Sequence, residues 1–70
     1  MISKKLLKQY SVKNVNAYFD AILKEYEAEQ FNTVLAMFSN GNDEQKKEFV
    51  VKLVNKGAKK DIIVYFINLI

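Results

Sequence analysis

The sequence contains no cysteine, no histidine, no proline and no tryptophan among its 70 residues. Without cysteine no disulfide can stabilise the chain, and without cysteine or histidine it has no thiolate or imidazole ligand for a structural metal. The same absences remove the commonest general base and the strongest nucleophile that enzymes use. We therefore expect no catalytic residue, no metal site and no cofactor, and we interpret the chain as a protein that is not an enzyme.

Arginine is absent too, so all 11 basic residues are lysines and the formal net charge is +3. A modest positive charge permits contact with nucleic acid or an anionic surface without requiring it. The missing arginine disfavours base-specific reading of DNA, because bidentate contact of Arg with guanine is the commonest specific contact. AT-rich codons for Lys, Asn and Ile would also explain this composition, so it is weak evidence about function.

Long apolar runs and targeting signals are also lacking. The densest apolar stretch, residues 62–70, is interrupted by Asn68 and has about half the length that spans a bilayer. Residues 1–7 are short and charged, unlike a signal peptide. We expect a cytoplasmic protein with no membrane partner.

Half of the residues are nevertheless hydrophobic. A chain of this length forms a single domain, residues 1–70, and its small core cannot hide so much apolar surface. With disulfides and metals excluded, association is the remaining source of extra stability. We expect a protein partner or a second copy of the chain.

Helical spacing dominates the pattern of apolar residues. Residues 3–10 predict a short basic helix, and Ser11 predicts the N-cap of a longer one. The apolar residues of that longer helix are Val12, Val15, Phe19, Ile22, Leu23 and Tyr26. The next apolar set lies more than a quarter-turn out of phase, at Phe31, Val34, Leu35 and Phe38. The helix either breaks near residues 27–30 or continues with two faces, and we favour the break.

Residues 39–43 give the strongest turn signal. Gly41 suits a left-handed position after a helix, and Asn42 with Gln45 predicts a capping box for the next one. Lys56 and Gly57 predict the end of that helix. Its predicted apolar face consists of Phe49, Val50, Leu53 and Val54.

Residues 59–70 are ambiguous, because an apolar, β-branched run fits a buried helix or a buried strand. A lone two-stranded sheet is marginal, so we favour a helix. The predicted fold class is all-α, a compact bundle of three to five short helices. The alternative is an α+β fold in which residues 49–55 and 62–69 form a C-terminal hairpin.

Chemistry-bearing side chains are few. The acidic stretch Asp20, Glu25, Glu27 and Glu29 is typical of a solvated helix face, and no cleft of useful size is expected in so short a chain. We expect no small-molecule substrate.

Two features remain as candidate binding surfaces. The first is the surplus of aromatic and aliphatic residues, because aromatic side chains bury large areas at interfaces. We predict a protein interface on the C-terminal helix, at Ile62, Tyr65, Phe66 and Leu69. An equally weighted interpretation makes this helix the centre of the core. The leading hypothesis is a small regulatory interaction module, an adaptor or inhibitor that self-associates.

The second feature is a lysine cluster around Gly57, in a helix–Gly–helix arrangement like half of many helix-turn-helix units. The alternative hypothesis is a nucleic-acid-binding module that contacts phosphates through Lys52, Lys56, Lys59 and Lys60. Against it, residues 62–70 offer only Asn68 and the Tyr65 hydroxyl to read base edges.

Overall fold

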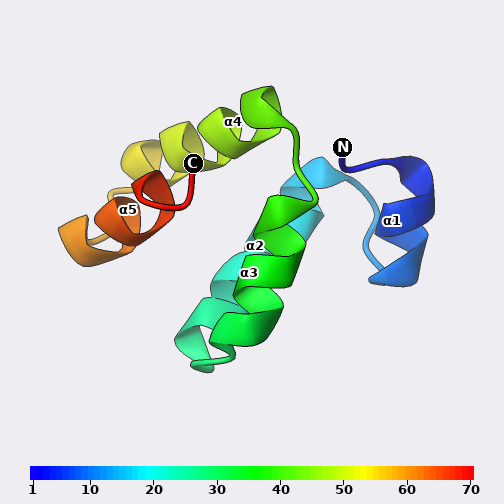
Figure 1. Cartoon of the computed structure of the whole chain (residues 1–70), viewed down its shortest axis with the longest axis horizontal. Helices are drawn as coiled ribbons and strands as arrows, with labels where there is room; N and C mark the ends of the chain where they lie inside the picture. The colour runs from blue at the N-terminus through cyan, green and yellow to red at the C-terminus, as the bar shows by residue number, and fades with distance from the viewer.

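The computed structural model describes residues 1–70 as five helices and no strand. These are α1 (Lys4–Gln9), α2 (Val15–Glu27), α3 (Phe31–Ser39), α4 (Asp43–Asn55) and α5 (Lys60–Ile67). Figure 1 shows α2 and α3 side by side, α5 folded back beneath α4, and α1 at the opposite end of the long axis from α5. The predicted all-α bundle is therefore confirmed, and the alternative C-terminal hairpin is wrong because residues 60–67 form a helix.

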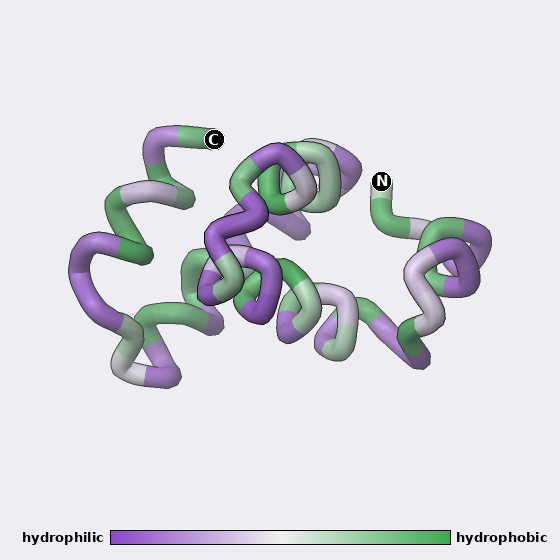
Figure 2. The backbone as a smooth tube through the Cα atoms, turned by 90° about the horizontal axis from the view of Figure 1, so that it is seen from below, coloured by the Kyte–Doolittle hydropathy of each residue, from purple (hydrophilic) through white to green (hydrophobic).

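Hydrophobic and hydrophilic residues alternate along the helices, as the tube in Figure 2 shows. Each helix therefore has one side suited to packing and one suited to water. The core lies where these apolar sides meet. Its ten buried hydrophobic residues are Ile2, Tyr18, Phe19, Ile22, Val34, Met37, Phe38, Phe49, Leu53 and Phe66.

The apolar faces differ in part from the spacing-based prediction. Tyr18 and Met37 are fully or almost fully buried although neither belonged to a predicted apolar set. Conversely, Phe31, Leu35 and Val54 were predicted on apolar faces and are 43%, 42% and 56% exposed. A short bundle has too little interior to cover every residue of a wide apolar stripe.

Three helices end in the same hydrogen-bonded arrangement. After α2, Glu29 N–H donates to Tyr26 O and Gln30 N–H donates to Glu25 O. This pair of bonds is the Schellman motif, which places the residue after the C-cap in the left-handed region. Glu29 accordingly has φ of +60°. The break expected near residues 27–30 is confirmed, and it forms without glycine or proline.

The same motif corrects the role of Ser11. Ser11 has φ of +56° and its N–H donates to Lys8 O, so it ends α1 rather than capping α2. The N-cap of α2 is Asn14, whose side chain accepts a hydrogen bond of 2.8 Å from Ala17 N–H. Both Ser and Asn are good caps, and spacing alone did not distinguish them.

Glycine has its expected role at one of the two predicted positions. Gly57 has φ of +72° and ends α4, as predicted. Gly41 does not adopt positive φ, so the left-handed conformation predicted for it is wrong. It lies buried in the turn between α3 and α4, with Phe38 O and the Ile2 side chain close to where a Cβ would project.

The capping box at the start of α4 is confirmed. Asn42 Oδ1 accepts from Gln45 N–H at 2.8 Å, and Gln45 Oε1 accepts from Asn42 N–H at 3.1 Å. The Gln45 amide also holds the N-terminal segment: its Oε1 accepts from Ile2 N–H at 2.9 Å and its Nε2 donates to Ile2 O at 3.3 Å. One side chain thus starts α4 and fixes the segment that leads into α1.

Candidate protein-interaction surface

The four residues predicted for the interface lie on α5 or just after it, and they differ in burial. Phe66 has no exposed surface. Its ring lies 4.7 Å from that of Phe49 and 5.2 Å from that of Phe38, between ring centroids. We therefore assign Phe66 to the core and not to a surface that a partner could contact. Ile62 and Leu69 are partly buried against the core, and Tyr65 is partly exposed.

Three aromatic rings from three helices meet at the surface. Tyr26 of α2 lies 5.6 Å from Phe31 of α3 and 5.2 Å from Tyr65 of α5, both in edge-on geometry. Phe31 and Tyr65 are stacked at 5.9 Å. These separations are those of attractive aromatic pairs. The rings thus hold one another in place, and Phe31 remains 43% exposed.

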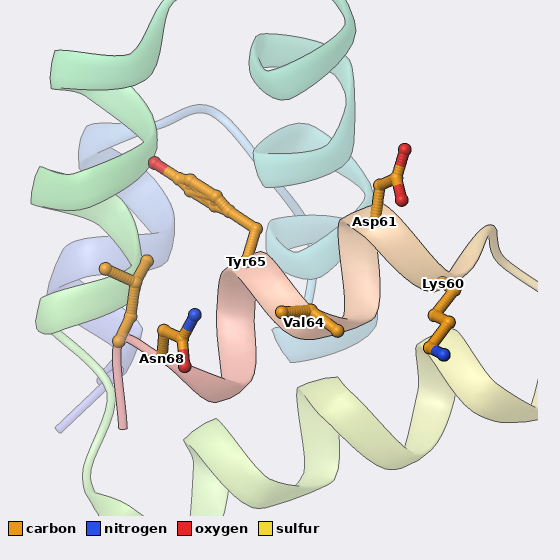
Figure 3. A pocket seen from close by; sticks show the side chains of 6 residues that line it. Lys60, Asp61, Val64, Tyr65 and Asn68 are labelled. Atoms are coloured by element: carbon orange, nitrogen blue, oxygen red, sulfur yellow. The ribbon is translucent and has the colours of Figure 1, made fainter.

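A shallow hollow of about 760 Å³ runs along α5 beside this aromatic group. Two helical rows line it, and they comprise Lys60, Val64 and Asn68 together with Asp61, Tyr65 and Leu69. In Figure 3 the Tyr65 ring extends from α5 toward α3, while Lys60 and Asn68 mark the two ends of the helix face. The hollow therefore has an apolar floor and polar ends.

Further exposed apolar side chains adjoin these residues. Leu35 lies one turn after Phe31 on α3 and is 42% exposed, and Val64 in the hollow is 44% exposed. We name the set Phe31, Leu35, Val64, Tyr65 and Leu69 the α3/α5 surface. Sequence reasoning identified Tyr65 and Leu69 but assigned Phe31 and Leu35 to a core-facing stripe. Their exposure depends on where α5 packs, which the pattern within α3 does not reveal.

The lysine cluster of the alternative hypothesis does not form one free surface. Lys52 Nζ donates to Asp20 Oδ1 at 3.0 Å and to Asn16 O at 3.3 Å, while Lys56 Nζ lies 3.8 Å from the same carboxylate oxygen. The hydrogen bond from Lys52 lowers the pKa of Asp20, and the positive charge nearby acts in the same direction. Two of the four lysines thus serve to join α4 to α2.

Lys59 and Lys60, the other two lysines, are exposed at the start of α5 and form no ion pair. They line different hollows, Lys59 beside Leu23 and Glu27 and Lys60 beside Asp61 and Tyr65. The sequence did not reveal that Asp20 is the partner of Lys52, because the two are 32 residues apart. The phosphate-binding role of the four lysines stays a prediction.

The remaining polar side chains offer little further chemistry. Ser3 caps α1, and Ser39 Oγ donates to Leu35 O at 2.8 Å. No group of three or more acidic residues is placed to hold a metal ion. None of the helices combines the length and hydropathy needed to cross a bilayer. Comparison of the chain with protein-family models, curated proteins and solved structures found no match.

Proposed function

We propose that this chain is a small regulatory interaction module, an adaptor or inhibitor that acts by occupying a partner surface, and that it self-associates through the α3/α5 surface. The supporting observation is the exposed aromatic stack of Phe31 on Tyr65, bordered by Leu35 and Val64. Aromatic anchors with few rotors bury large areas at little entropic cost. Lys60, Asp61 and Asn68 around the hollow provide the polar rim that interfaces commonly have.

The packing of Tyr65 strengthens this proposal. Its ring contacts Tyr26, Phe31 and Phe66, so it is already held in one position before any partner arrives. Side chains that need not be ordered on binding lose less conformational entropy. The surface is therefore suited to recognition without rearrangement of the helices.

Light scattering coupled to size-exclusion chromatography tests the proposal. A double variant, Leu35→Lys with Val64→Lys, adds charge to the α3/α5 surface at two positions that are already about half exposed. The matched control is Val51→Lys with Val54→Lys, which makes the same chemical change at two exposed positions of α4. We expect the wild type and the control to elute as dimers and the α3/α5 variant to elute as a monomer.

Two results would contradict the proposal. A wild type that stays at the monomer mass of 8.1 kDa at high protein concentration would remove self-association. Equal loss of the dimer in both double variants would show that added charge, and not the α3/α5 surface, controls association. Circular dichroism of each variant establishes that the helices are retained.

A further inference from the structure

The short helix α1 has two chemically distinct sides. Lys4, Lys5 and Lys8 are exposed, whereas Leu6, Leu7 and Tyr10 are partly buried against the core. At 100° per residue, the three lysines fall within about a third of the helix circumference. We call Lys4, Lys5 and Lys8 the α1 basic face.

None of these three lysines forms an ion pair. The first acidic residue of the chain is Asp20, and the two ion pairs of the structure involve Lys52 and Lys56 instead. The α1 basic face therefore presents three exposed positive charges without an ion-pair partner within a helix of six residues. Such a concentration of one sign of charge attracts polyanions.

The N-terminal segment fixes α1 to the body of the protein. Ile2 is 5% exposed, and the Gln45 side chain bonds both its N–H and its carbonyl. The apolar side of α1 is thus used by the core, whereas a helix that lies on a membrane must turn its apolar side to the lipid. This arrangement favours a partner that is bound by charge alone.

We propose that the α1 basic face binds the phosphate backbone of nucleic acid, without sequence preference. Lysine makes point-charge contacts with phosphates, and no arginine is present to read base edges. Figure 1 places α1 at the opposite end of the molecule from α5, so this site is separate from the α3/α5 surface. The inference does not depend on the proposed self-association.

Fluorescence anisotropy with a labelled 20-base-pair DNA duplex of arbitrary sequence, titrated at several salt concentrations, tests the proposal. One variant replaces Lys4, Lys5 and Lys8 with Gln. The matched control replaces Lys47, Lys59 and Lys60 with Gln, which removes the same charge from three exposed lysines that form no ion pair elsewhere in the chain. Glutamine and lysine have similar helix propensities, so both variants should keep their helices, as circular dichroism can establish.

The expected magnitude follows from counterion release. Three phosphate contacts contribute a slope of about −2.7 to the dependence of log affinity on log salt concentration. Through these contacts, the affinity of the wild type and of the control for DNA should fall about 40-fold between 50 and 200 mM salt. The affinity of the α1 variant should depend much less on salt. Its affinity at 50 mM salt should fall well below that of the control.

Two outcomes would overturn the proposal. The first is no binding of DNA by the wild type at 50 mM salt, and the second is an equal loss of affinity in both triple variants. In the first case, sedimentation of the protein with vesicles of phosphatidylserine and phosphatidylcholine would assign the α1 basic face to an anionic membrane.

Discussion

The buried hydroxyl of Tyr18 supports the sharpest prediction about this fold. Its Oη donates a hydrogen bond of 2.7 Å to Met37 O and accepts one of 3.3 Å from Asn40 Nδ2. Met37 O lies in the last turn of α3, and Gly41 N–H, which could have bonded it, donates to Phe38 O instead. The phenol of α2 therefore satisfies a carbonyl at the end of α3 that no backbone N–H reaches.

Replacing Tyr18 with Phe removes this hydroxyl and keeps the ring. An unsatisfied buried carbonyl costs about 1–3 kcal/mol, so we expect the free energy of unfolding to fall by about 2 kcal/mol. A domain of 70 residues has a total of about 4–10 kcal/mol, so the loss is a large fraction of it. The corresponding decrease in the melting temperature is about 8–16 °C.

Urea denaturation followed by circular dichroism measures this effect. A change below about 0.5 kcal/mol, typical of a neutral surface substitution, would refute the reasoning about the orphaned carbonyl. Tyr10, whose ring lies edge-on to Tyr18 at 5.4 Å, offers a matched control. Its hydroxyl forms no hydrogen bond within the protein, so Tyr10→Phe should leave the stability nearly unchanged.

The same hydroxyl makes stability depend on alkaline pH. Burial raises the pKa of Tyr18 above 10.0, against the opposing hydrogen bond from Asn40. A raised pKa in the folded state means that the neutral phenol stabilises the protein fully below about pH 10, and that this contribution is lost as the pH rises through the pKa of the folded state. The difference in stability between the wild type and Tyr18→Phe should therefore shrink above pH 10.

Three further substitutions test individual contacts. Gln45→Ala should lower the free energy of unfolding by about 1–2 kcal/mol, because it removes part of a capping box and two hydrogen bonds to Ile2. Faster hydrogen exchange of the Ile2 amide proton would show that the N-terminal segment has been released. Asp20→Asn should cost less than about 1 kcal/mol, since the Asp20 side chain is 54% exposed and water screens its pair with Lys52. The hydrogen bond from Lys52 lowers the pKa of Asp20. The stability that Asp20 adds should therefore be present above about pH 4 and disappear as the pH falls through the pKa of the folded state. Acid titration of the wild type and Asp20→Asn measures this difference. Gly57→Ala should cost about 1 kcal/mol in urea denaturation through its positive φ alone, because nothing lies within 4 Å of the added methyl group.

Several structural features that depend on residues close together in the sequence were predicted correctly. The capping box of Asn42 and Gln45 and the end of α4 at Gly57 each depend on residues within one turn of one another. The break before Phe31 followed from the change of phase between two apolar sets. The helical state of residues 60–67 also followed, because no third strand was available to pair with them. The capping box and the end of α4 are local features, and local propensities determine them.

Structural features that depend on how the helices pack against one another could not be predicted from the sequence. Ser11 and Glu29 occupy left-handed positions that usually take Gly or Asn, so their types gave no signal. The exposure of Phe31 and the burial of Phe66 both depend on how α5 lies against α3. Asp20 is exposed, as expected, but its ion pair with Lys52 was not predicted because the two residues are 32 positions apart in the sequence.

The pairing of neighbours along the chain has a consequence for how the protein folds. The most extensive helix contacts join α2 to α3 and α4 to α5, each across a turn of a few residues. Contacts of such short sequence separation close small loops, and topologies of this kind fold in microseconds to milliseconds. No proline is present to add a slow isomerisation phase. We therefore expect a single fast refolding phase, in which two helical hairpins form early and then dock through Phe19 on Phe49 and Phe38 on Phe66.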